Sequence, residues 1–238
     1  MKFTKLFVIL FTTIILAGCV TSPNFKLVRQ IYTPIPQTSK NIDIPLYKKP
    51  HPLEGLPYNY WHYSKQKQEQ LKLISPETSA AAQIFRVWIT NPVGRSSQPH
   101  GIIEIVQDSN KMEGNLILMN VDFDVRKLKE TIADSKRIAL TPKTLSWSQI
   151  TDSLIALQFH ELPTDEKLPG YDLKTRGYST NATTFSFEYA TPEKYRFYQY
   201  TDIYQNQHIF TEVANVVKML DLLESEFEWD TQAREYFR

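Results

Sequence analysis

The stretch TTFSFEYATPEKYRFYQYTD, residues 183–202, alternates apolar and polar side chains on both sides of a short turn. Phe185, Phe187 and Tyr189 recur at every second position, which is the period of a β-strand that buries one face. Residues 191–194 have the composition of a turn, and the chain then runs back through a second segment. This stretch therefore predicts an antiparallel hairpin.

Three earlier segments have the length and composition of strands, namely residues 83–90, 101–106 and 114–123. Each is rich in aliphatic or aromatic residues, and loops that contain turn-forming residues separate them. Short connections favour pairing between neighbours in the sequence. We therefore expect these segments to form an antiparallel meander.

Four segments are predicted as helices. Ser146 and Gln149 form a capping box at the start of one helix, because each side chain can bond the backbone amide of the other residue. Residues 210–227 have an apolar stripe at helical spacing, with acidic residues opposite. Two shorter helices are predicted, one at 65–73 and one that Asp124 caps and that ends at residue 132.

The order of elements along the chain predicts the fold class. Three strands, a helix, two strands and a helix indicate an α+β fold, in which an antiparallel sheet of about five strands has its helices packed on one face. From residue 85 to about residue 226, the segments FRVWIT, GNLILMNV, FHELP and YRFYQY occur in an order that resembles a loosely defined group of exported bacterial domains of unknown function. This resemblance lies in the pattern of elements, and it implies the topology without assigning any catalytic residue.

The N-terminus has the parts of an export signal: Lys2 and Lys5, an apolar run at 6–16, and small residues before Cys19. The apolar run is shorter than the roughly 20 residues that span a bilayer. Its end, Leu-Ala-Gly-Cys, resembles the lipobox of bacterial lipoproteins. The resemblance implies that Cys19, the only cysteine of the chain, is lipidated and becomes the first residue of the mature protein.

The same resemblance predicts the localisation. The mature chain begins with Cys19 and Val20, without the aspartate that usually retains such lipoproteins at the inner membrane, so we expect the bacterial outer membrane, with the domain facing the periplasm. Two or more acyl chains anchor a protein stably, and the membrane is thus an expected partner through the lipid on Cys19. No later cysteine is left for a disulfide or for thiolate chemistry.

Three regions are predicted: residues 1–18 as the lipoprotein signal peptide, residues 19–60 as a lipidated, proline-rich tether, and residues 61–238 as a single α+β domain. Seven of the chain's 14 prolines fall in the tether, where they argue against a helix or a central strand. Ile42 and Ile44 are more apolar than a linker requires. We therefore expect the second half of the tether to lie against the domain.

Composition argues against some partners and cofactors. Without Lys2 and Lys5 the chain has 25 basic and 26 acidic residues, which offers no support for a nucleic-acid partner. No histidine stands in a metal-binding spacing such as HExxH, and we expect no metal and no cofactor. His100 and Glu104 share one face of a predicted strand as a two-ligand fragment, but polar surface residues at the edge of a sheet explain them as well.

Paired carboxylates are the candidates for catalysis. Asp122 and Asp124 stand two residues apart at a strand end, and Glu161 follows a predicted helix. Carboxylates can divide acid and base roles when separate elements present them across a cleft. The alternative function is therefore a cell-envelope hydrolase that acts on peptidoglycan or lipid, although a capping residue and a turn residue explain the aspartate pair as well.

Tyrosines near the end of the hairpin are the candidate recognition residues. Tyr198 and Tyr200 lie on the face opposite Tyr195 and Phe197, with Tyr204 nearby. Tyrosines that stand in solvent offer a large contact area with a polar tip, whereas cross-strand packing alone would also place tyrosines there. We expect a non-catalytic module that binds an envelope protein or glycan, for example an immunity or inhibitor protein that occupies a toxin or hydrolase.

Overall fold

The computed structural model describes residues 35–45, 59–81, 83–90, 98–108, 111–124, 129–169 and 183–237. The chain divides into two units, Met1–Tyr32 and Thr33–Arg238, and all described residues belong to the second unit. The predicted signal peptide and Cys19 lie outside the described residues. Among the helices in these ranges, none is long and apolar enough to cross a membrane.

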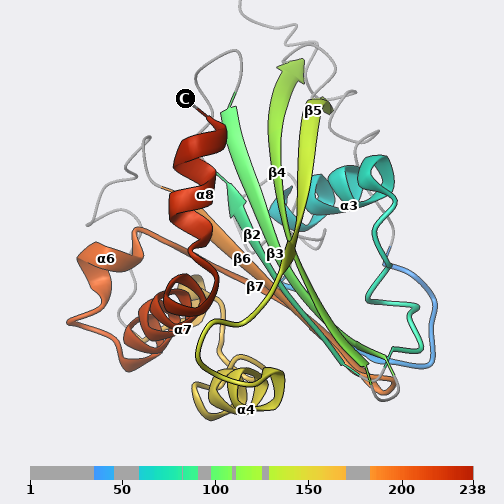
Figure 1. Ribbon diagram of the computed structural model, residues 1–238. Coiled ribbons are helices and arrows are strands. Elements are labelled where there is room, and N and C mark those ends of the chain that lie inside the picture. Colours follow the sequence, from blue (N-terminus) through green and yellow to red (C-terminus); the bar gives the residue numbers. More distant parts are fainter. Residues whose placement is uncertain are drawn as a thin grey trace, which may run out of the picture. The chain divides into compact units, whose positions relative to one another are not determined.

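Within these ranges seven strands form one mixed sheet, in the order β1-β7-β6-β2-β3-β4-β5 (Figure 1). Neighbouring strands are antiparallel, except that β1 runs parallel to β7. The predicted hairpin is confirmed as β6–β7 and the predicted meander as β2–β3–β4, so the α+β class is confirmed, with two strands more than expected. The strands are β1 (Asn41–Asp43), β2 (Gln83–Thr90), β3 (Gln98–Asp108), β4 (Lys111–Asp124), β5 (Lys129–Leu140), β6 (Thr184–Ala190) and β7 (Lys194–Thr201).

β5 includes residues 129–132, which the sequence predicts as part of a helix. Asp124 is the last residue of β4, and β5 pairs with β4 along its length. The prediction of a helix up to residue 132 is therefore wrong. β5 is an edge strand whose side chains are mostly exposed, so it lacks the alternation of apolar and polar residues that marks a half-buried strand.

β1 lies inside the stretch that is predicted as a tether. Ile42 pairs with Tyr195 of β7, and Ile44 is buried just beyond the strand. The expectation that this part of the chain lies against the domain is confirmed. A proline-rich segment tolerates a strand only at an edge, and β1 occupies the edge of the sheet.

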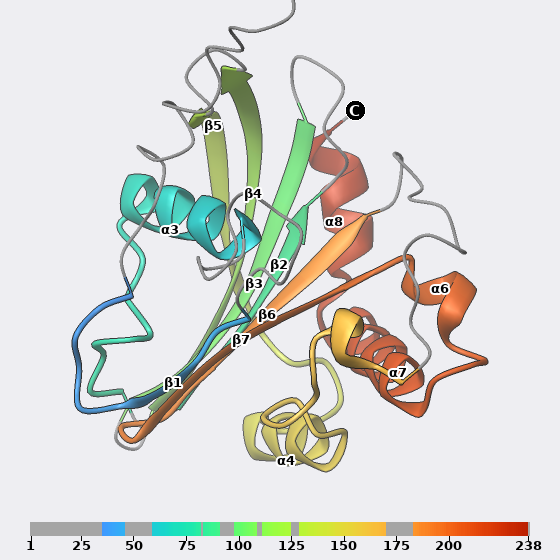
Figure 2. The same ribbon diagram turned by 180° about the vertical axis from the view of Figure 1, so that it is seen from behind.

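Helices cover both faces of the sheet, so the prediction that they pack on one face is wrong (Figures 1 and 2). Phe85 and Val87 of β2 belong to the core beneath α4, α7 and α8, whereas Ile84 and Trp88 lie in clusters that α3 covers. Both faces of the central strands are buried, and each face therefore needs its own cover. The helices are α3 (Asn59–Leu71), α4 (Trp147–Ala156), α6 (Ile203–Asn206), α7 (Thr211–Phe227) and α8 (Trp229–Tyr236), with the 3₁₀ turn η1 (Asp165–Lys167).

The two strongest helix predictions are confirmed. The side chain of Ser146 accepts the amide proton of Gln149 at 3.3 Å, and Oε1 of Gln149 accepts that of Ser146 at 2.8 Å, so the predicted capping box starts α4. The apolar stripe of α7 is buried against the sheet along most of its length. The polar side of α7 is left outside this core.

Two strand glycines differ in the space that surrounds them. At Gly114 of β4, a Cβ atom would overlap Cη2 of Trp147, because the indole of α4 packs directly on the strand backbone. At Gly101 of β3, the nearest atom to such a Cβ would be Cδ1 of Ile89 at 3.4 Å, an ordinary contact distance. The first glycine is required by close packing, and the second leaves room above the sheet.

Alanine at these two positions should have opposite consequences. Gly114→Ala forces the Trp147 ring away and should lower the free energy of unfolding by about 1–3 kcal/mol. Gly101→Ala should change it by less than about 1 kcal/mol, since no neighbour has to move. Urea denaturation followed by circular dichroism measures both values, and equal losses for the two variants would contradict this packing.

Candidate functional site

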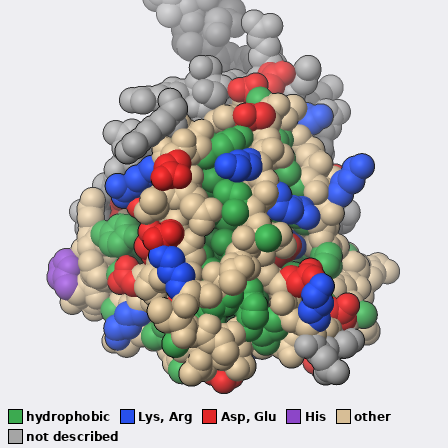
Figure 3. Space-filling model, viewed as in Figure 1, with side chains coloured by type: hydrophobic (Ala, Val, Ile, Leu, Met, Phe, Trp, Pro, Cys, Tyr) green, Lys and Arg blue, Asp and Glu red, His purple; other side chains and the backbone are tan. Residues whose placement is uncertain are grey.

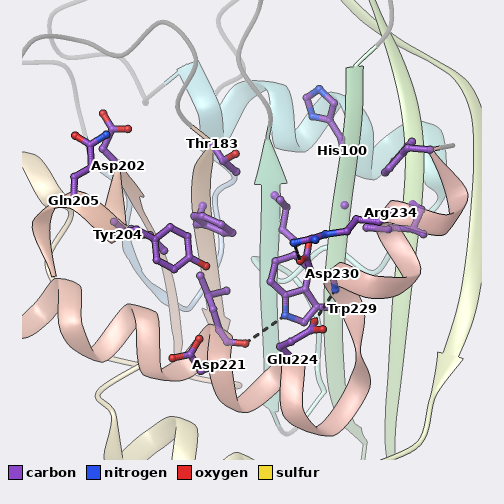
Figure 4. A pocket seen from close by; sticks show the side chains of 18 residues that line it. His100, Thr183, Asp202, Tyr204, Gln205, Asp221, Glu224, Trp229, Asp230 and Arg234 are labelled. Atoms are coloured by element: carbon purple, nitrogen blue, oxygen red, sulfur yellow. Dashed lines mark hydrogen bonds and ion pairs between the residues drawn. The ribbon is translucent and has the colours of Figure 1, made fainter.

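A pocket of about 720 Å³ opens between the sheet and the three C-terminal helices (Figure 4). Its floor is apolar and comes from four different strands: Ile89 of β2, Gly101 of β3, Leu118 of β4 and Phe185 of β6. A volume between about 300 and 1,000 Å³ is typical of pockets that hold small molecules. The other lining residues come mainly from α6, α7 and α8 and are Thr183, Asp202, Ile203, Tyr204, Gln205, Leu220, Asp221, Glu224, Trp229, Asp230, Ala233, Arg234 and Phe237, with His100 at one end.

Two residues in left-handed backbone conformation shape the walls of the pocket. Asp202 has φ 55° between β7 and α6, and Glu228 has φ 51° between α7 and α8. Neither is a glycine, so each such residue costs on the order of 1–3 kcal/mol. Glu228 turns the chain so that α8 leaves α7 and packs on β3 and β4, and Asp202 turns it into α6 beside α7.

The helices carry acidic side chains to the rim of the pocket. Oε2 of Glu224 accepts the amide proton of Asp230 at 2.7 Å, which caps the first turn of α8. Asp230 in turn forms an ion pair with Arg234 one turn later. Within the part of the chain that the structure describes, neither the carboxylate of Asp202 nor that of Asp221 pairs with a cation.

These carboxylates make the pocket electronegative. Burial raises the pKa of Tyr204, and the negative charges of Asp221, Asp230 and Glu224 raise it further. Burial also raises the pKa of Asp202. In Figure 4 the ring of Tyr204 lies on the α6 side of the cavity and the indole of Trp229 on the α8 side, with Asp221 of α7 below them.

The opposite face of the sheet holds a cluster of buried charges around Arg86 of β2. The guanidinium donates from Nε to Glu104 at 2.8 Å, from Nη1 to Glu188 at 2.9 Å, and from Nη2 to the carbonyl oxygen of Ile74 at 2.9 Å. Arg86 and Glu188 are both 0% exposed. Charges this deeply buried are tolerated only with partners of opposite sign, and here both partners come from neighbouring strands.

α3 completes this cluster with two lysines. Nζ of Lys65 lies 2.8 Å from Glu188 and 2.6 Å from Glu77, and Nζ of Lys67 lies 2.9 Å from Glu130 of β5. Burial alone would raise the pKa of Glu188, but Lys65, Arg86 and hydrogen bonds from Lys65 and the Tyr195 hydroxyl together lower it to about 2. Glu188 is therefore ionised at neutral pH, and the ion pairs of the cluster tie α3 to strands on both sides of β2.

The structure corrects the prediction of an exposed tyrosine surface. Tyr198 and Tyr200 are 1% and 0% exposed, and their hydroxyls donate to the carbonyl oxygens of Phe159 at 2.8 Å and Pro163 at 2.6 Å. The prediction is wrong for both residues, because the segment after α4 covers the face that the sequence leaves without a cover. Tyr204 is 57% exposed, and it lies at the rim of the pocket.

His100 and Glu104 are not surface residues at a sheet edge, as the sequence also allows. β3 is central, and both side chains are buried beneath α3, with Nδ1 of His100 at 3.4 Å from Nζ of Lys67. They belong to the ionic cluster. Among the residues that the structure describes, no group of three His, Cys, Asp or Glu side chains is placed to hold a metal ion.

Glu161 is not brought together with Asp122 and Asp124, the other two candidate catalytic carboxylates. Asp122 and Asp124 lie at the carboxyl end of β4, at the top of Figure 1, whereas Glu161 follows α4, which lies at the bottom. Glu161 instead pairs with its neighbour His160 at 3.1 Å.

Sequence reasoning missed both the pocket and the ionic cluster. The cluster has a signal in the sequence, since a single charged residue interrupts each of three apolar strands: Arg86, Glu104 and Glu188. The register pairs Arg86 with both of the others. The pocket has a weaker signal, which is Gly101 at the start of an otherwise β-branched segment.

Comparison of the chain with protein-family models, with curated proteins and with solved structures gives no match.

The buried histidine makes stability depend on pH. Burial and the positive charge of Lys67 lower the pKa of His100 to about 2, so the folded protein holds this ring neutral while the unfolded chain takes up a proton below about pH 6.5. The stability that this neutral histidine contributes is therefore fully present above pH 6.5 and is lost as the pH falls towards 2. One such group contributes a slope of about 1.4 kcal/mol per pH unit.

His100→Asn keeps an acceptor for Lys67 and removes the proton site, so it should flatten the dependence of unfolding free energy on pH between 6 and 4. Burial lowers the pKa of His62 to about 4, so that residue preserves part of the slope in the variant. Urea denaturation at several pH values measures the slope, and His208→Asn, at an exposed position, controls for the loss of a histidine. A slope equal to that of the wild type would show that His100 is not held neutral.

Proposed function

We propose that this chain is a lipid-anchored binding protein of the bacterial outer membrane that acts without catalysis, faces the periplasm, and holds its ligand in the pocket beside α6, α7 and α8. The observation that carries the proposal is the pocket itself, which has the volume of a small-molecule site and an apolar floor. The lipobox ending at Cys19 supports the anchor. The pocket replaces the tyrosine surface as the candidate site.

Two of the four rim carboxylates are engaged in the structure of the wall, and the other two, Asp202 and Asp221, have no cationic partner among the described residues. Glu224 is engaged at the start of α8, and Asp230 is held by Arg234, so both serve the structure of the wall. An acid–base pair would instead need two carboxylates aimed at one bond from separate elements. Of the carboxylates that the hydrolase alternative names, Asp122 and Asp124 come from one strand, and Glu161 follows α4 at the other end of the sheet.

The spacing of the chain fits a tethered domain. The described part of the domain begins at residue 35, and the segment 35–45 already contacts β7 at the edge of the sheet. The proposed tether thus leaves residues 19–34 between the lipid on Cys19 and the described domain.

The anchor is tested by labelling cells with a radioactive fatty acid. The wild-type chain should take up the label, and Cys19→Ser should take up none, because the thiol is the site of acylation. Ser22→Ala, three residues further along, is the matched control and should be labelled like the wild type. Label on the Cys19→Ser chain would contradict the proposed lipid anchor.

The pocket is tested by filling it from its floor. The full chain in nanodiscs of phosphatidylcholine is titrated with 4-phenylbutan-1-ol in a calorimeter, with empty nanodiscs as the blank. The wild type should bind this neutral probe, and Gly101→Leu should weaken binding at least tenfold, since its side chain rises from the floor beside Ile89 and Leu118. Gly101→Ala should bind nearly as the wild type does. No binding by the wild type, or equal binding by Gly101→Leu, would refute the pocket as the site.

A further inference from the structure

We infer that the pocket selects amphiphilic cations, that is, small molecules with an aromatic or branched apolar body and one protonated amine. The inference rests on the proposed function, because it names the ligand class of the same pocket. It is carried by the division of the lining into an apolar floor and a rim with excess negative charge.

The apolar half of the pocket suits the body of such a ligand. Ile89, Leu118 and Phe185 present only carbon atoms from their side chains, and Gly101 between them adds no side chain that would fill the space. Apolar area removed from water is worth about 25 cal/mol per Å². The floor therefore favours a hydrophobic body of any charge type and does not by itself select among ligands.

The charged half of the pocket determines which class of ligand it binds. Four carboxylates line the rim, and one guanidinium, that of Arg234, stands among them in the described lining; the carboxylates are those of Asp202, Asp221, Glu224 and Asp230. Arg234 is already paired with Asp230. An anion would be repelled by this excess negative charge, and the described lining has no unpaired cation to bind it. An ammonium group would instead be attracted by the carboxylates of the rim.

The arrangement of the rim suggests where the amine lies. Asp221 extends from α7 below the cavity, and Tyr204 stands beside it with an aromatic ring that is largely exposed (Figure 4). A cation within about 6 Å of an aromatic face gains attraction from the ring as well as from the carboxylate. On the face of the molecule seen in Figure 3, hydrophobic side chains lie among acidic and basic ones.

The selectivity is tested with three probes of nearly equal shape. 4-Phenylbutylamine, 4-phenylbutan-1-ol and 4-phenylbutyrate differ in the charge at one end. With the full chain in phosphatidylcholine nanodiscs, the amine should bind about tenfold tighter than the alcohol or better, since a charge-assisted hydrogen bond exceeds a neutral one, and the carboxylate should bind most weakly. The advantage of the amine should shrink as salt is raised from about 50 to 500 mM.

Asp221→Asn should remove most of the amine's advantage and leave the alcohol unchanged. Asp152→Asn, which alters an exposed carboxylate on α4 outside the pocket, is the matched control and should keep the wild-type order of the three probes. An amine advantage that survives in Asp221→Asn would overturn the role given to that residue and with it this inference.

The test separates the inference from the function on which it rests. If the three probes bind equally and Gly101→Leu abolishes all of them, the pocket is a site but its selection of cations is refuted. If none of the probes binds, or if Gly101→Leu leaves all three affinities unchanged, the proposed function fails together with the inference.

Discussion

The buried guanidinium of Arg86 sets the condition that the rest of the structure must meet. It lies near the centre of the sheet at 0% exposure, where the loss of a charged partner would cost about 3–5 kcal/mol. The antiparallel pairing of β2 with β3 and β6 places Glu104 and Glu188 directly opposite it. A slip of one residue would turn either carboxylate to the other face of the sheet. The charges therefore specify the register together with the apolar residues.

The position of α3 follows from these charges. Two carboxylates face one guanidinium, and the helix above them supplies the missing positive charge through Lys65, which reaches Glu188 and Glu77. This explains why a helix as hydrophilic as α3 packs on a sheet with its lysines buried. One face of the sheet is thus closed by ion pairs together with two apolar clusters, and the opposite face by one apolar core. The pocket opens on this second face, where its floor offers carbon surface for the body of a ligand.

Sequence patterns predicted the elements in which a single apolar face stands out. They failed for elements that are covered on both faces. The alternation of Phe185, Phe187 and Tyr189 predicted β6, and the stripe of α7 predicted that helix. The hairpin pattern predicted a solvent face for Tyr198 and Tyr200, and Arg86 likewise stands between apolar residues as the polar member of a pair. Their burial depends on α3 and on the segment after α4, which reach the strands only through tertiary packing. A pattern within one strand contains no information on what lies above its second face.

The pocket could not be predicted from sequence for a related reason. Its floor collects Ile89 and Phe185 from strands almost 100 residues apart, and its wall depends on the left-handed turn at Glu228, which the sequence presents as one more acid in a helical stretch. Because of that turn α8 leaves α7 and packs on β3 and β4, and the pocket lies between these helices, α6 and the sheet (Figure 4). The polar edge of α7 then borders an apolar floor. The acidic rim is thus a consequence of an amphipathic helix that covers only part of its sheet, and the same geometry that leaves the space open also gives it its charge.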